Sequence, residues 1–77
     1  MARLGLYGGT FDPIHIGHMH VITQLLRRDV VDQILLFPAG QPRLREHDPF
    51  ATGAQRRAMC ELAVTDLPTD ISSRVEV

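Results

Sequence analysis

Residues 8–18, with the sequence GGTFDPIHIGH, constrain the fold of this chain more than any other segment. They follow a short apolar segment at 4–7 and lead into a stretch of helical periodicity that begins near Gly17. When a strand, a glycine turn and a helix follow in this order, backbone N–H groups and the helix dipole meet at one point and favour an anion. His15 and His18 are three residues apart, so a helix places both imidazoles on one face. The segment therefore predicts a phosphate-binding site.

Apolar periodicity along the rest of the chain predicts an α/β fold with a parallel sheet. The expected order is β-α-β-α-β: a buried strand at 3–8, a helix at 17–28, a strand at 33–37, a helix that starts at a Thr52–Gln55 capping box, and a half-exposed strand at 71–77. Right-handed crossovers then give three parallel strands in the order 3-2-1. This arrangement is Rossmann-like and corresponds to one half of a doubly wound fold.

The second helix is expected to bury one apolar stripe, made of Ala58, Met59, Leu62 and Ala63. Two arginines at its start, Arg56 and Arg57, are interpreted as solvated, although a cation there opposes the helix dipole. Arg74 is expected on the solvent face of the last strand. All eight basic residues of the chain are arginines, whose planar guanidinium suits bidentate contacts to phosphate.

Composition excludes several classes of function. No apolar run approaches the ~20 residues that span a bilayer, so no membrane partner is expected. A net charge of -1 produces no field that would attract nucleic acid. The single cysteine, Cys60, excludes an internal disulfide and fits a reducing, cytoplasmic location.

The GGTFDPIHIGH run resembles the signature of the nucleotidylyltransferases, in which an H-x-G-H motif follows the first strand of a Rossmann-like sheet. It looks most like that of the bacterial nicotinate mononucleotide adenylyltransferases. Residues 36–42 resemble the second strand and loop of that family, and residues 56–64 are similar to its second helix. The resemblance implies adenylyl transfer from ATP to nicotinate mononucleotide, giving deamido-NAD and pyrophosphate. It also implies Mg²⁺ held by the ATP phosphates, with no protein-ligated metal.

Each residue type in the motif suits this chemistry. Gly8 and Gly9 permit close approach of the backbone to a nucleotide, and Gly17 permits it at the first turn of the helix. Thr10 offers a hydroxyl and an N–H to a phosphate oxygen. The resemblance implies that the H-x-G-H residues, His15, Gly17 and His18, bind the ATP phosphates and carry catalysis, with the two imidazoles donating to phosphate oxygens.

Three further residue sets have both structural and functional interpretations. Phe11 either packs under the turn or stacks on a substrate ring, and packing is preferred. Asp12, before Pro13, is interpreted first as a turn former and second as a substrate contact. Arg43 and Arg45 follow the second strand, where the family carries a phosphate-binding basic residue. Two interpretations stay open: at least one of them fills that role, or both are solvated loop charges.

Alternatives remain at this point. A protein-bound zinc site is disfavoured, because His20 points about 200° around a helix from His18. His20 is therefore expected on the surface. The runner-up enzyme is a pantetheine-phosphate adenylyltransferase, which the resemblance places in the same superfamily. The family is longer than this chain and carries a second phosphate motif that the chain lacks. Residues 1–77 are therefore interpreted as the N-terminal half of the domain. The alternatives are a nucleotide-binding half-domain without independent activity, or an inert truncation that forms a homo-oligomer through the bare edge of its first strand.

Overall fold

The computed structural model describes residues 2–38 and 51–77 of the chain. Six elements follow one another in these two ranges: β1 (Leu4–Gly9), α1 (Ile16–Arg27), β2 (Gln33–Pro38), α2 (Gly53–Thr65), α3 (Thr69–Ser72) and β3 (Val75–Glu76). Arg43 and Arg45 lie outside the described residues. Within the described ranges, none of the helices has the length and apolar character needed to cross a membrane.

The three strands form one parallel sheet in the order β1-β2-β3. The order expected from the sequence, 3-2-1, likewise places the second strand in the middle. β1 pairs with β2 along its whole length, from Leu4 opposite Gln33 to Gly9 opposite Pro38. The strands therefore end together, which places the segment after Gly9 at the carboxyl edge of the sheet.

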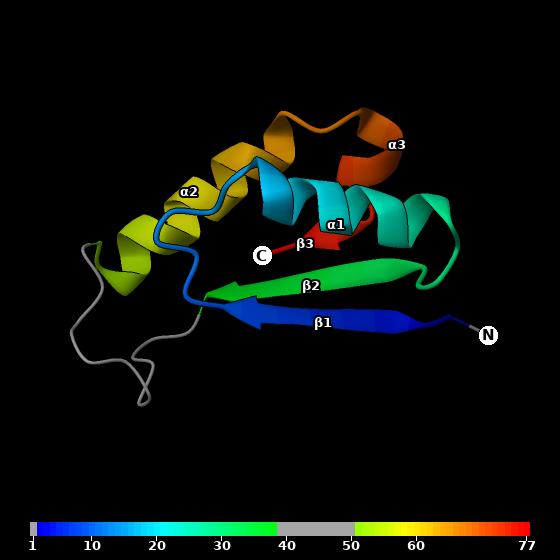
Figure 1. The fold of residues 1–77 in the computed structure, drawn as a ribbon, viewed down its shortest axis with the longest axis horizontal. Helices are drawn as coiled ribbons and strands as arrows, with labels where there is room; N and C mark the ends of the chain where they lie inside the picture. The colour runs from blue at the N-terminus through cyan, green and yellow to red at the C-terminus, as the bar shows by residue number, and fades with distance from the viewer. Residues whose placement is uncertain (1, 39–50) are drawn as a thin grey trace.

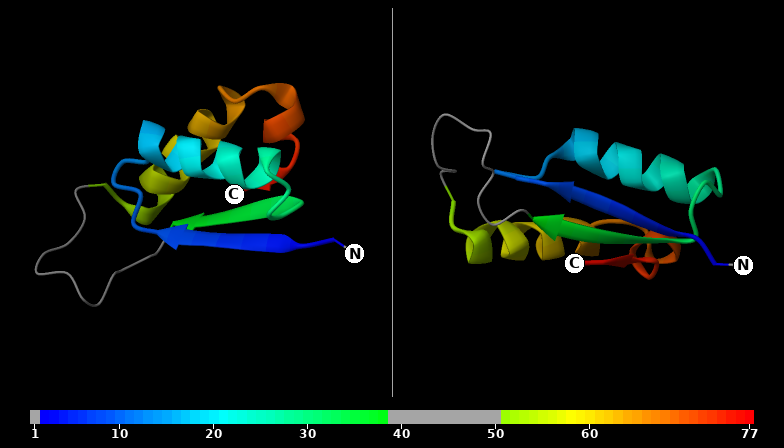
Figure 2. Two further views of the ribbon diagram at one scale, coloured as in Figure 1. Left: turned by 45° about the vertical axis from the view of Figure 1, so that its right-hand side comes forward. Right: turned by 90° about the horizontal axis from the view of Figure 1, so that it is seen from below.

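Both long helices, α1 and α2, cover the same face of this sheet (Figures 1 and 2). Ile34 and Leu36 of β2 point to that face and are buried in the core. On the opposite face, Leu4 is 60% and Leu6 65% exposed, so the prediction that the first strand is buried on both faces was wrong. Two right-handed crossovers that progress in one direction place their helices on one side, and the other side stays uncovered.

The buried face of α2 also differs from the prediction. The capping box is confirmed, because Gln55 N donates to Thr52 Oγ1 at 3.1 Å and Thr52 N to Gln55 Oε1 at 2.9 Å. Its buried residues are Arg56, Cys60 and Val64, spaced by four, rather than the predicted apolar stripe. Leu62 of that predicted stripe is 67% exposed. The stripe was wrong because the buried face of α2 contains an arginine, which no hydrophobic pattern selects.

The last expected strand, at 71–77, is a strand only at Val75–Glu76. Before it, the short helix α3 begins after Pro68, whose carbonyl accepts from Ile71 N at 2.9 Å and from Ser72 N at 2.8 Å. Ile71 is 1% exposed and enters the core from this turn. Alternation of apolar and polar residues over so short a span did not distinguish a helical turn from a strand.

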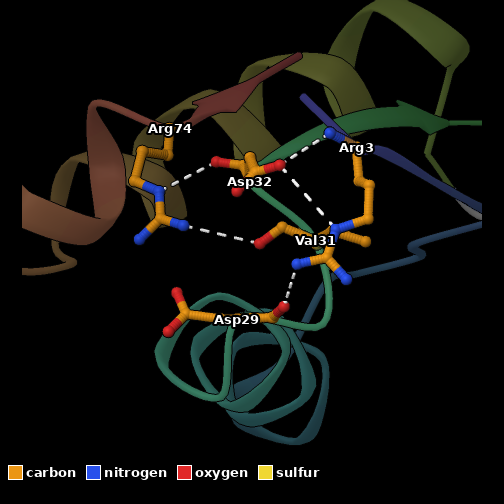
Figure 3. Close-up of polar contacts among 5 residues, drawn as sticks. All are labelled: Arg3, Asp29, Val31, Asp32 and Arg74. Carbon is orange, nitrogen blue, oxygen red and sulfur yellow. Dashed lines mark hydrogen bonds and ion pairs between the residues drawn. The ribbon is translucent and has the colours of Figure 1, made fainter. Parts of the chain in front are cut away.

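Arg74 is part-buried, which contradicts its predicted position on the solvent face. Its Nε donates to the Asp32 carbonyl at 2.8 Å, and its Nη2 to the Val31 carbonyl at 3.4 Å. The Asp32 carboxylate accepts from Arg3 N at 2.6 Å, and Asp32 lies between the two arginines (Figure 3). These contacts join the starts of all three strands, at the end of the sheet opposite the glycine turn.

Candidate functional site

A cavity of about 300 Å³ lies at the carboxyl end of β1, where the chain turns into α1. It is lined by Tyr7, Gly8, Gly9, Thr10, Phe11, Asp12, Pro13, His15 and His18. Six of these were predicted from the sequence as site residues: Gly8, Gly9, Thr10, Phe11, His15 and His18. Gly17 stands next to this lining in the first turn of α1. The structure therefore brings the whole glycine–histidine segment to one place.

His15 and His18 cap α1 reciprocally. His15 is the N-cap residue, and its Nδ1 accepts from Gly17 N at 3.0 Å. In return, His15 N donates to Nδ1 of His18 at 3.0 Å. The two rings lie 3.8 Å apart between centroids, at an interplanar angle of 32°. This is a capping box in which imidazoles replace the usual hydroxyl and carboxamide groups.

The cap determines which donors the site can offer. An Nδ1 that accepts from a backbone N–H carries no proton, so each neutral ring holds its proton on Nε2. The amides of His15 and Gly17 are used within the cap, and His18 N donates to the His15 carbonyl at 3.0 Å. The sequence predicted that backbone amides would meet the anion directly. In the structure, the imidazole Nε2–H groups are the donors left free by the cap itself.

The environment of His18 keeps its ring neutral. Its imidazole packs edge-on against Phe11, with 4.9 Å between ring centroids, and lies 6.2 Å from the Tyr7 ring. Burial lowers the pKa of His18 below its ordinary value of 6.5, and the charge of a protonated His15 lowers it further. At neutral pH, His18 is therefore an uncharged donor.

This lowered pKa predicts how stability depends on pH. The unfolded chain protonates His18 near pH 6.5, whereas the folded chain does so only at a lower pH. Between these two pKa values the unfolded state binds more protons, so the free energy of unfolding falls as the pH drops below 6.5. Urea unfolding at a series of pH values measures this slope. The His18→Gln variant is expected to show a smaller slope in that window, and an unchanged slope contradicts the prediction.

Gly17 has a reason for being glycine that the sequence did not reveal. A Cβ at this position would lie 2.9 Å from Cε1 and 3.0 Å from Nδ1 of the His15 ring. The sequence analysis assigned the space over Gly17 to a ligand, but the His15 imidazole itself fills it. Gly17 therefore makes the reciprocal cap possible.

Replacing Gly17 with alanine is expected to displace the His15 ring from the helix terminus. Loss of the cap costs ~0.5–2 kcal/mol, and the better helix propensity of alanine returns ~1 kcal/mol, so stability changes little. The His15 and His18 ring resonances should move markedly in NMR spectra. Gly53→Ala, in the first turn of α2, is the control, because among the described residues the nearest atom to its Cβ is Arg56 Nη2, at 3.7 Å. Unmoved His15 and His18 resonances in Gly17→Ala would contradict this explanation.

Gly8 also stands against a ring, on the uncovered face of the sheet. A Cβ there would lie 2.5 Å from Phe37 Cε2, so the absence of a side chain lets the Phe37 ring lie across β1. Phe37 is 47% exposed and was not singled out in the sequence. Its position directly opposite Gly8 follows from the strand register, which a single sequence does not provide.

The preferred interpretations of Phe11 and Asp12 are confirmed. Phe11 is 4% exposed and belongs to the hydrophobic core, with a backbone φ of 50°. Asp12 Oδ1 accepts from Ala51 N at 3.1 Å, which joins the turn to the segment before α2. Both residues belong to the cavity lining and are also held by contacts within the protein.

Arg56 is a further residue that the sequence analysis placed wrongly. It is 1% exposed, not solvated, and its Nη1 donates to the Thr10 carbonyl at 2.9 Å. Its Nε donates to the Ala51 carbonyl at 3.2 Å. The unfavourable position of a cation at a helix N-terminus was the one signal of this role in the sequence. Its neighbour Arg57 is exposed, as expected, and pairs with Glu61 at 3.1 Å.

No protein-bound metal centre emerges in residues 2–38 and 51–77, where no three His, Cys, Asp or Glu side chains are grouped to hold an ion. His20 is exposed on α1, as predicted.

The model of one family, described as cytidylyltransferase-like, matches residues 6–74. The chain belongs to this family. Among curated relatives, a probable nicotinate-nucleotide adenylyltransferase of Thermomicrobium roseum is 41% identical over 100% of this chain and 36% of its own length. One of the same name from Pseudomonas aeruginosa is 47% identical over 80% of this chain and 28% of its own. The chain thus spans about a third of the length of these relatives.

A solved structure supports the fold. The chain is similar to Plasmodium falciparum nicotinic acid mononucleotide adenylyltransferase complexed with NaAD, with a TM-score of 0.81 and 19% identity. The match covers 100% of this chain and 36% of that one. The α/β arrangement of three parallel strands is therefore the fold found in that structure.

Proposed function

We propose that this chain forms the N-terminal part of a nicotinate-nucleotide adenylyltransferase, which joins ATP and nicotinate mononucleotide in NAD biosynthesis. The observation that carries the proposal is the reciprocal cap of His15 and His18, which leaves two neutral Nε2–H donors beside a cavity at the end of β1. The names of the curated relatives supply the substrates. The description of the matching family names no nicotinate acceptor, so the acceptor rests on these relatives.

In the proposed reaction, a phosphate oxygen of nicotinate mononucleotide attacks the α-phosphorus of ATP. The bond from that phosphorus to the oxygen bridging to the β-phosphate breaks, and pyrophosphate leaves with the electron pair. The protein needs no covalent nucleophile, because positioning and stabilisation of charge supply the rate enhancement. His15, His18 and Thr10 would donate to phosphate oxygens, and the Gly8–Gly9 backbone would approach the nucleotide closely.

The family resemblance also implies Mg²⁺, which would reach the site bound to the ATP phosphates and neutralise part of their charge. The described side chains fit this arrangement, since they offer donors to phosphate rather than a set of metal ligands. A phosphate contact by Arg43 or Arg45 stays a prediction.

We further propose that residues 1–77 are one half of a doubly wound domain. The uncovered face of the sheet, with Leu4 and Leu6 exposed, supports this, because such a fold covers both faces. A cytoplasmic location is proposed on the same functional grounds, as are nicotinate mononucleotide and ATP as the binding partners. Association of two copies through the free edge of β1 stays a prediction.

A pyrophosphate-release assay tests the proposed reaction. The 77-residue chain is incubated with Mg·ATP and nicotinate mononucleotide, and separately with Mg·ATP and pantetheine phosphate. Release with the first acceptor supports the proposal, and release with the second alone replaces it with the runner-up enzyme. ATP binding without release identifies a half-domain that needs the remainder of the longer protein for turnover.

A further inference from the structure

Arg56, on α2, forms a hydrogen bond to Thr10 at the candidate site, 46 residues earlier in the chain. Among the described residues it is the buried charged side chain, with 1% of its surface exposed. Removal of a guanidinium from water costs several kcal/mol unless hydrogen bonds replace the lost hydration. Two of the hydrogen bonds that replace the lost water are donated to backbone carbonyls, Thr10 O at 2.9 Å and Ala51 O at 3.2 Å. The first of these belongs to the wall of the site cavity.

The turn that Arg56 contacts is held from both ends. At one end, Arg56 Nη1 donates a hydrogen bond to the carbonyl of Thr10. At the other end, Ala51 N donates to the carboxylate of Asp12 at 3.1 Å. Between them, Phe11 has a φ of 50°, in the left-handed region that disfavours a bulky residue. A conformation of this kind is strained and persists only where the surroundings determine it.

The ring of Phe11 transmits this geometry to the histidine pair. It meets His18 edge-on, with centroids 4.9 Å apart and planes at 89°. It also meets the Tyr7 ring, with centroids 5.5 Å apart and planes at 83°. The Nδ1 of His18 is held by His15 N, so Phe11 and this hydrogen bond together fix the plane of the imidazole.

We propose that Arg56 is a positioning residue: it holds the Thr10–Asp12 turn and, through Phe11, sets the orientation of the His18 imidazole toward phosphate. The orientation of the ring is a property of the chain without ligand. Its purpose, directing Nε2–H to a nucleotide, rests on the proposed function.

Three variants separate this role from simple filling of the core. Arg56→Met keeps an unbranched side chain of similar length and loses every donor. Arg56→Lys keeps the charge but cannot reach two carbonyls in the planar geometry of a guanidinium. Arg57→Met is the matched control, because it makes the same chemical change at the adjacent, exposed position, where the side chain pairs with Glu61.

The first readout is the NMR spectrum of the histidine rings in the chain without nucleotide. In folded Arg56→Met, we expect the His18 ring resonances to shift as the contact with Phe11 loosens, and the His18 pKa to rise toward 6.5. Arg56→Lys should restore part of the wild-type spectrum, and Arg57→Met should leave it unchanged. A folded Arg56→Met with wild-type His18 resonances and titration overturns the proposal.

A second measurement covers the case in which Arg56→Met does not fold. In the wild-type chain, the Arg56 Nε–H should exchange with solvent at least ~10-fold more slowly than the Arg57 Nε–H, since slow exchange follows from a buried hydrogen bond. Equal exchange rates overturn the proposal. Neither readout requires ATP, so they test Arg56 even if the chain fails to bind nucleotide, whereas the wild-type binding and release assays test the proposed function alone.

Discussion

Replacement of His18 with alanine is expected to lower kcat for adenylyl transfer by ~10²–10³, the usual loss when one transition-state donor is removed. The His18 ring is neutral and its Nδ1 is engaged by the cap, so the donor that it can offer to a phosphate is a single, oriented Nε2–H. Pyrophosphate release, measured on the chain or on a longer protein that contains it, gives kcat directly.

His20→Ala is the control for this experiment, because His20 is exposed on the same helix and does not line the cavity. It should leave kcat within about twofold of wild type, as expected for a surface substitution. The fold of His18→Ala should persist, since Phe11 and Tyr7 stay in place against the core. An unchanged kcat in His18→Ala contradicts the role assigned to this residue.

Replacement of Ile22 with alanine is expected to lower the free energy of unfolding by ~2–5 kcal/mol, through lost burial and the cavity left behind. Ile22 is 0% exposed and lies on the face of α1 that packs against the sheet. Domains of this size are stable by only ~5–15 kcal/mol in total. Urea denaturation followed by circular dichroism measures the change, and Ile22→Ala should have a much lower midpoint than wild type.

Leu62→Ala is the matched aliphatic substitution on a helix surface. Leu62 is 67% exposed, so its truncation should change the free energy of unfolding by no more than ~0.5 kcal/mol. An equal loss of unfolding free energy in Ile22→Ala and Leu62→Ala would contradict the core described above. It would instead support the buried apolar stripe on α2 that the sequence predicted.

Local signals in the sequence predicted the parts of this fold that depend on neighbouring residues. The strand before Gly8, the helix that follows His15 and the Thr52 capping box each depend on contacts within a few residues. The parallel pairing followed from right-handed crossovers, which are a general property of such chains. The order of strand, glycine turn and helix start is also local, and it predicted that Gly8, Gly9, Thr10, His15 and His18 lie together at the end of β1, as they do around the cavity.

The missed features depend on contacts between distant segments. Arg56 was interpreted as solvated because its partners, Thr10 and Ala51, are recognisable only after folding, and its burial also concealed the true inner face of α2. The position of Phe37 over Gly8 required the strand register. The reciprocal His15–His18 cap was missed for a different reason: imidazoles rarely take this role, so the pattern was interpreted as a ligand motif alone.

Isothermal titration of the 77-residue chain with Mg·ATP at pH 7.5, in parallel with His18→Ala and His20→Ala, tests the central claim most directly. The claim is that the histidine-capped start of α1 binds nucleotide phosphates. It predicts binding by the wild-type chain and by His20→Ala with similar affinity, and at least ~10-fold weaker binding by His18→Ala, as for a lost hydrogen bond to a charged group. Absence of binding, or equal affinity in all three proteins, would contradict it.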